Sequence, residues 1–144
     1  MIKAFTLIEY LVVLAVISII IGITLPAYKI LQPSFQLSGA VRTLLTDLHY
    51  SQQLTVTEQV NYCLKFFLPE KKYQIIRCGQ NTPILEVFLP AEIATFDAVG
   101  FTDNQVEFNP YGAVKESGSI LLINTSNKTK TIEVKPSGFI RITD

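Results

Sequence analysis

One long apolar run near the N-terminus limits what this chain can fold into more than any other feature. The run extends from Phe5 to Leu25, which is 21 of the 144 residues, and Glu9 is its single charged residue. As an α-helix, at about 1.5 Å per residue, it would be roughly 31 Å long, close to the hydrocarbon thickness of a bilayer. The length disfavours a buried helix of a soluble protein and predicts one membrane-spanning helix.

A cleaved secretory signal is one alternative to a membrane anchor. Such a signal has a shorter apolar core and a small-x-small cleavage site, whereas "LPAYKILQ" follows the core here. An anchor fits the length but leaves Glu9 unexplained, because an acidic side chain inside a span costs a few kcal/mol. Lys3 and Lys29 flank the run and give opposite signals about which end is cytoplasmic. The pattern therefore favours an anchor without fixing its orientation.

The composition gives no sign of catalytic or metal chemistry. Lys and Arg together number 12, as do Asp and Glu, so no net charge points to a nucleic acid or an acidic partner. Cys63 and Cys78 are not in a CxxC pair, and His49 is the only histidine. The sequence has no GxSxG, HExxH or phosphate-loop motif, and the polar residues around Gly100 do not match a calcium loop. We therefore predict no catalytic residue, no metal ligand and no cofactor.

The pattern after Pro33 is typical of an amphipathic helix. Apolar residues recur there at i, i+4, i+7 and i+11, which predicts a helix over residues 34–57 with one face packed on the rest of the chain. The stripe consists of Leu37, Val41, Leu44 and Leu48, with Leu45 beside it and Gln52 at its end.

From Val60 onward the hydrophobic period changes to two, which indicates β-strands. Turn residues separate short apolar segments every eight to twelve residues, as in an antiparallel sheet domain. After the segment that starts at Val60, the predicted strands are "YQIIRC", "ILEVFL", "AEIATF", "QVEF", "SILLIN", "TIEVK" and "GFIRI". The fold class is therefore α+β: a long N-terminal α-helix, with a transmembrane half over 5–25 and an amphipathic half over 26–58, packed on an antiparallel β-sheet head over 59–144.

The first two strands predict a hairpin that brings the two cysteines together. A turn centred on the E and K of "PEKK" pairs residues whose numbers sum to 141. Phe66 then faces Ile75, and Cys63 faces Cys78, in the same register that buries the apolar face. We expect a disulfide, which an oxidising compartment would permit; two free cysteines packed as small apolar groups are the alternative.

The stretch "AFTLIEYLVVLAVISIIIGITLPAY" resembles the N-terminus of type IV prepilin-like proteins. In that family a short basic leader and a small residue precede a methylatable Phe, "TLIE" and an apolar helix. The resemblance implies a leader over 1–4, peptidase cleavage between Ala4 and Phe5, and N-methylation of Phe5. This chain has Ala4 where the family usually has Gly, which leaves the efficiency of cleavage open.

The same resemblance assigns roles inside the helix. Glu9 is implied to pair with the Phe5 amine of an adjacent subunit during assembly, so that a buried pair offsets part of its desolvation cost. Gly22 and Pro26 fall where the family's helix is weakened, and a proline inside a helix tends to kink it.

Two later stretches are similar to GspH/FimT pseudopilins, a family of minor pilins. They are "AVRTLLTDLHYSQQLTVTEQVNYCLKF" and "VEFNPYGAVKESGSILLINTSNKTKTIEVKPSGFIRI", the second with "F-x-P-x-G", a Gly-led strand and "G-x-I-x-I". The resemblance implies a pilin-like fold and a structural, non-enzymatic minor subunit of a type II secretion system or type IV pilus. The implied partners are other pilin subunits, prepilin peptidase and the inner-membrane assembly platform. The implied location is the bacterial inner membrane, single-pass with a periplasmic head, and then the pseudopilus or pilus.

A membrane-anchored binding module, such as a DNA-uptake minor pilin, is the alternative function. Phosphate contacts need several undiluted cations. Glu133 and Asp144 dilute the cations near the C-terminus, which are Lys128, Lys130, Lys135 and Arg141. The sequence therefore favours the structural role over nucleic-acid binding, and it leaves open whether the system is secretory, pilus-forming or competence-related.

Overall fold

The computed structural model describes residues 6–143, and one long helix is its first element. This helix, α1, covers Leu7–Glu58 and has 52 residues. The chain divides into two compact units, residues 1–32 and residues 33–144, so the boundary between them falls inside α1. The other elements are β1 (Tyr62–Phe67), β2 (Lys72–Arg77), β3 (Pro83–Phe88), β4 (Ile93–Val99), the short 3-10 helix η1 (Thr102–Asn104), β5 (Gln105–Phe108), β6 (Gly118–Asn124), β7 (Thr129–Val134) and β8 (Ile140–Thr143).

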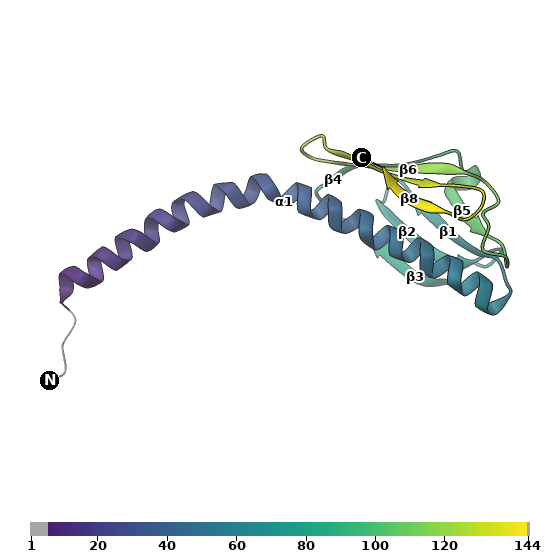
Figure 1. Cartoon of the computed structure of the whole chain (residues 1–144), viewed down its shortest axis with the longest axis horizontal. Helices are drawn as coiled ribbons and strands as arrows, with labels where there is room; N and C mark the ends of the chain where they lie inside the picture. The colour runs from purple at the N-terminus through teal and green to yellow at the C-terminus, as the bar shows by residue number, and fades with distance from the viewer. Residues whose placement is uncertain (1–5, 144) are drawn as a thin grey trace. The chain divides into compact units, whose positions relative to one another are not determined.

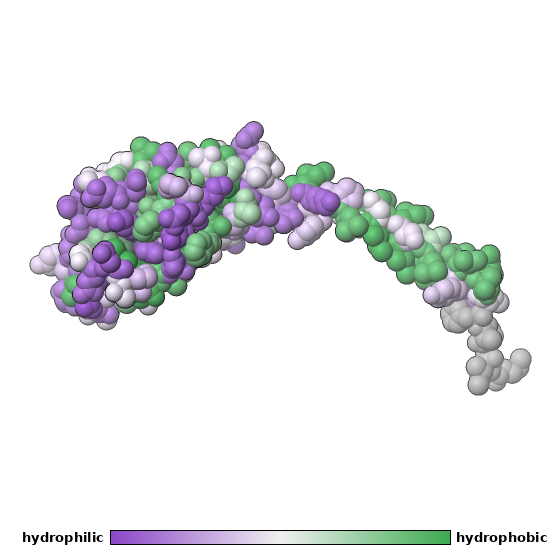
Figure 2. Space-filling model, turned by 180° about the vertical axis from the view of Figure 1, so that it is seen from behind, coloured by the Kyte–Doolittle hydropathy of each residue, from purple (hydrophilic) through white to green (hydrophobic). Residues whose placement is uncertain are grey.

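The described part of the first unit is a helix that is exposed around its whole circumference. The side chains of residues 6–31 are all exposed. Apolar residues, green in Figure 2, cover most of the visible face of this segment. Two hydroxyls in the middle of the apolar stretch bond inside the helix: Ser18 Oγ donates to the Leu14 carbonyl and Thr24 Oγ1 to the Ile20 carbonyl, each at 2.8 Å. Neither hydroxyl proton therefore needs water or a partner residue.

In the second unit, the last part of α1 packs against two sheets of four strands each (Figure 1). The strand orders are β3-β2-β1-β5 and β4-β6-β7-β8, and every pair of neighbours is antiparallel. The predicted fold class is confirmed. The head has two antiparallel sheets, whereas the strand pattern predicted a single sheet domain. The rings of Phe66 on β1 and Phe96 on β4 meet edge to face with centroids 5.5 Å apart, which joins the two sheets.

The buried face of α1 is the predicted apolar stripe. Leu37, Val41, Leu44 and Leu48 are at most 1 % exposed and belong to one hydrophobic cluster with side chains of both sheets. A hydrogen bond adds a directional contact, because the Tyr73 hydroxyl donates to Asp47 on α1 at 2.5 Å. Burial, and then the Asp47 carboxylate, raise the pKa of Tyr73 far above its ordinary value, so the phenol stays a donor.

The hairpin of β1 and β2 has a different register from the predicted one. Phe66 pairs with Tyr73, so paired residue numbers sum to 139 and the prediction of 141 was wrong. The turn covers Leu68 to Lys71 and is closed by the Lys71 N–H, which donates to the Leu68 carbonyl at 3.2 Å. Pro69 then occupies the second position of the turn, which its fixed φ favours. Because the shift is two residues, each side chain keeps its predicted face of the sheet.

A disulfide joins Cys63 and Cys78 even though they are not directly opposite each other. Cys63 pairs with Ile76, whereas the Cys78 N–H donates to the Asn61 carbonyl at 3.0 Å. The two cysteines are therefore diagonal neighbours, with Cα atoms 5.2 Å apart. The bond ties the end of β2 to the start of β1, and it is buried at Cys63, which is 1 % exposed, and partly buried at Cys78.

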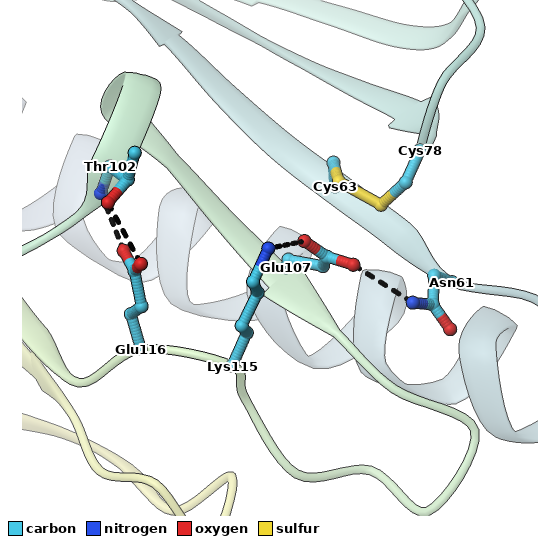
Figure 3. A network of polar contacts seen from close by, with 7 residues as sticks. All are labelled: Asn61, Cys63, Cys78, Thr102, Glu107, Lys115 and Glu116. Carbon is cyan, nitrogen blue, oxygen red and sulfur yellow. Dashed lines mark hydrogen bonds and ion pairs between the residues drawn. A yellow bond between two sulfur atoms is a disulfide. The ribbon is translucent and has the colours of Figure 1, made fainter.

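Polar contacts beside the disulfide hold β5 and the segment after it (Figure 3). Asn61 Nδ2 donates to Glu107 Oε1 at 2.9 Å, and the other oxygen of Glu107 lies 3.3 Å from Lys115 Nζ. The backbone N–H and the hydroxyl of Thr102 donate to the two carboxylate oxygens of Glu116, at 2.6 and 2.8 Å. The end of the loop that precedes β6 is thereby fixed to β5 and to η1.

Removing the disulfide should destabilise the head. The cysteines are 15 residues apart in sequence, and closing a loop of this size in the unfolded chain contributes about 2–4 kcal/mol. We expect the double variant Cys63→Ala/Cys78→Ala to lose that much free energy of unfolding, measured with urea on the full chain in detergent. Reductant should destabilise the wild type and leave the variant unchanged. A wild type that is indifferent to reductant would contradict the role of this bond.

Acidification should also weaken the head. Hydrogen bonds from the backbone N–H and hydroxyl of Thr102 lower the pKa of Glu116, and those from Tyr62 and Arg77 lower the pKa of Glu58. Their stabilisation is complete above the ordinary carboxyl pKa of 4.5 and is lost as the pH falls through the lower folded values.

We expect the temperature of thermal unfolding to fall between about pH 5 and pH 3. The variant Glu116→Gln cannot lose a charge at this position and should show a shallower fall. Equal profiles for the variant and the wild type would show that Glu116 does not contribute.

Candidate functional site

The start of α1 is defined by a hydrogen bond from Glu9 to Thr6. The Glu9 N–H donates to Thr6 Oγ1 at 3.4 Å, and the Tyr10 N–H donates to the Thr6 carbonyl at 3.3 Å. Thr6 is therefore the N-cap of the helix, and "TLIE" has the Thr-x-x-Glu order of a capping box. Sequence reasoning used these four residues as a family mark and missed the cap, although the spacing of Thr and Glu was a sufficient signal.

The cap gives Glu9 a local role. As the third residue of the helix it lies in the first turn, where a carboxylate interacts favourably with the partial positive charge of the helix N-terminus. Its charge therefore lies at one end of the apolar helix and not in the middle of it. The predicted contact with an adjacent subunit requires a second chain and stays a prediction.

Two predicted processing residues, Ala4 and Phe5, lie outside the described residues. Cleavage between them and methylation of Phe5 stay predictions.

Gly22 and Pro26, where the sequence predicts a kink, both lie within α1, which is helical across them. Pro26 has no N–H, so the Gly22 carbonyl lacks the partner that an α-helix provides. A Cβ atom added at Gly22 would meet nothing within 4 Å.

In the described part of the chain, one helix is long and apolar enough to cross a membrane, and it is α1. A helix that is apolar all round is stable in lipid or among other apolar helices, since water would leave its whole surface unfavourably exposed. The exposed apolar surface of the first unit is therefore more stable in an apolar environment than in water.

In the head, a side chain near the end of α1 connects the helix to two turns. Gln52 Nε2 donates to the carbonyls of Gly112 and Gly138, at 2.6 and 3.1 Å. Both glycines are buried with a φ of +80°, in the left-handed region that glycine adopts without strain. A Cβ atom at Gly138 would overlap the Gly112 carbonyl oxygen, so the two turns approach each other as closely as their backbones allow.

This contact explains part of the C-terminal pattern of the sequence. The glycines are the last residue of "F-x-P-x-G" and the first of "G-x-I-x-I", and the third glycine, Gly118, opens β6. A Cβ at Gly118 would overlap the Val99 carbonyl and the Phe101 ring. Sequence reasoning placed turns correctly here and put Gln52 at the end of the helix stripe. It missed the two hydrogen bonds of Gln52, because the partners are 60 and 86 residues away in sequence.

Within residues 6–143, no group of three His, Cys, Asp or Glu side chains is placed to hold a metal ion. His49 is exposed on α1. Of the cations considered for nucleic acid, Arg141 is paired with Glu133 at 2.5 Å, which reduces the positive charge on this part of the surface.

No protein-family model matches the sequence, and no curated protein matches it. Solved structures do match the fold. The minor pilin FimU of the type IV pilus of Pseudomonas aeruginosa aligns with a TM-score of 0.66 and 13 % identity, over 77 % of this chain and 90 % of that one. A second crystal form of FimU gives a TM-score of 0.59 and 12 % identity, over 74 % and 92 % of the two chains.

The minor pseudopilin EpsH from the type II secretion system of Vibrio cholerae aligns with a TM-score of 0.57 and 8 % identity, over 71 % of this chain and 91 % of that one. At these identities the matches show the fold. This chain shares its fold with the minor pilin FimU and the minor pseudopilin EpsH over the aligned part.

The close contact of the two turns can be tested with a pair of glycines. Gly138 and Gly79 both have a positive φ, +80° and +85°, but an added Cβ at Gly79 would meet nothing within 4 Å. Both alanine variants should lose the backbone preference of glycine, and Gly138→Ala should lose about 1–3 kcal/mol more because of overpacking. Urea unfolding of the full chain measures both. Equal losses would mean that the turns separate without cost.

Proposed function

We propose that this chain is a structural, non-enzymatic minor subunit of a type IV pilus or of a type II secretion pseudopilus. One observation carries the proposal: α1 is apolar on every side over its first part and on one stripe over its second. The first part suits both lipid and a bundle of apolar helices, so it can leave a membrane for a filament core with little change in desolvation. The second part holds a head with the fold of FimU and EpsH, whose names describe a minor pilin and a minor pseudopilin.

The head would lie outside the cytoplasm. Disulfides such as that between Cys63 and Cys78 form and persist in oxidising compartments, of which the bacterial periplasm is one. We therefore infer a single pass through the inner membrane with the head on the periplasmic side, before the subunit enters the filament. The partners are other pilin-like subunits, the prepilin peptidase and the assembly platform.

Processing would prepare the helix end for assembly. Cleavage after Ala4 leaves a mature chain that begins at Phe5, one residue before the N-cap Thr6. The new amine is then covalently close to the first turn of α1, where Glu9 lies. In a filament the carboxylate would pair with the amine of an adjacent subunit, and each charge would reduce the desolvation cost of the other.

In the described part of the head, no observation favours a DNA-binding role. The pairing of Arg141 with Glu133 leaves fewer cations available to contact phosphates. The structural role is therefore the single function that we carry forward.

The variant Glu9→Gln tests the charge of Glu9 apart from its capping role. Glutamine also serves as the fourth residue of a capping box, so the helix start should be kept while the negative charge is lost. We expect the variant to insert in the membrane and to be cleaved like the wild type, but to be about tenfold depleted in filaments sheared from cells, because it cannot pair with the amine.

Glu70→Gln, in the exposed β1–β2 turn, is the matched control and should assemble normally. Mass spectrometry of the mature protein should show loss of residues 1–4 and a methylated Phe5. A mature protein that starts at Met1 would refute the proposed function, and normal incorporation of Glu9→Gln would refute the charge pair.

A further inference from the structure

The most exposed aromatic residue of the head stands on one of its most constrained turns. The side chain of Tyr111 is 92 % exposed. Asn109 Oδ1 accepts the N–H groups of Tyr111 and Ala113, at 3.0 and 3.1 Å, and the Gly112 N–H donates to the Asn109 carbonyl at 2.8 Å. Gln52 fixes the same turn to α1 through the Gly112 carbonyl.

These bonds do not need the ring. They use the backbone of the turn and the side chains of Asn109 and Gln52, so a smaller residue at position 111 would leave each of them in place. A ring that remains in water contributes little to folding. Its rigid position does reduce the conformational entropy that a partner would have to overcome on binding.

A hollow of about 400 Å³ lies beside Tyr111 and carries no acidic or basic side chain. Its apolar residue, Val56, is 45 % exposed. The lining consists of Gln52, Gln53, Val56, Thr57, Tyr111 and Gly112. Protein interfaces have this composition at their centres, with tyrosine enriched and charges depleted, whereas a nucleic acid or an anionic lipid surface would require cations. The hollow therefore fits an uncharged side chain of another protein.

The hollow lies at the end of α1 that is most distant in sequence from the apolar segment, since the helix ends at Glu58. If apolar segments bundle in a filament core, the heads contact one another, and a surface at this end of a head is available to the head of a neighbouring subunit. In a filament a minor subunit is outnumbered by other subunits, so most of its neighbours are different proteins. We propose that Tyr111 and the hollow beside it bind the head of a different pilin-like subunit, which covers the ring with an uncharged side chain. This inference rests on the proposed function and adds the contact surface and the chemistry of the partner.

Photo-crosslinking in the producing cells tests the surface directly. A benzophenone amino acid is placed at position 111 of the full chain, and separately at position 88. Phe88, at the end of β3, is 66 % exposed and serves as the control. Membrane and filament fractions are analysed together. The expected adduct from position 111 contains a different protein with its own N-terminal apolar helix, and this adduct is absent from position 88.

Substitutions at Tyr111 give the energetic test. Removal of an aromatic anchor commonly weakens an interface by tenfold or more, so Tyr111→Ser should lower co-purification of the partner by about tenfold. Tyr111→Phe keeps the ring and should stay within about twofold of the wild type, since the inference assigns binding to the ring. Both variants should unfold at the wild-type temperature, because the ring is exposed.

The outcomes separate this inference from the proposed function. Adducts at position 111 only with a second copy of the chain, only with a protein that lacks a pilin-like helix, or with no protein would overturn the inference. So would wild-type co-purification of the partner with Tyr111→Ser. Recovery of the wild type in sheared filaments would leave the proposed function intact in each case. Absence of the wild type from filaments would refute the function, while the adduct in membranes would still decide the surface.

Discussion

The buried stripe of α1 is the contact on which the rest of the head depends. Leu37, Val41, Leu44 and Leu48 bring one helix face into the same buried cluster as side chains of both sheets. Hydrogen bonds then fix the helix at two positions along its length, since Asp47 accepts from Tyr73 of β2 and Gln52 donates to two turns. Hydrophobic burial supplies most of the free energy, and these bonds select one position of the helix over its alternatives.

The same helix solves a different problem in each unit. In residues 33–58 the apolar side chains form a stripe, because one side of the helix meets water. In residues 7–31 nearly every side chain is apolar, and the hydroxyls of Ser18 and Thr24 are bonded to carbonyls of the preceding turn. A segment built in this way has no preferred face, so it can accept lipid or any number of apolar helices as neighbours. This is the physical property that a subunit needs if it changes from one surrounding to the other.

Hydrophobic periodicity predicted the helix and the strands well, whereas the turn residues predicted the register between strands less well. The helix stripe and the strand segments follow from spacings of 3.6 and 2, which depend on side chains near in sequence. The predicted hairpin register was wrong by two residues. The prediction centred the turn on Glu70 and Lys71, whereas Pro69 takes the second turn position, which its fixed φ favours. The division into two sheets and the contacts of Gln52 with Gly112 and Gly138 join residues far apart in sequence, and periodicity carries no information about such pairs. The cap at Thr6 is the opposite case, since its signal was local and visible.

Glu9 shows how one side chain can serve two states at different times. In the isolated chain its position in the first turn of α1 lets the carboxylate offset the partial positive charge of its own helix. A free amine at Phe5 would add a full positive charge one residue before the cap, and this charge also has to be compensated before it leaves water. A carboxylate with four acceptor positions can accept from its own helix and from an incoming amine together. Pairing across subunits therefore need not break the cap, and the helix can remain intact while the acid gains a second partner.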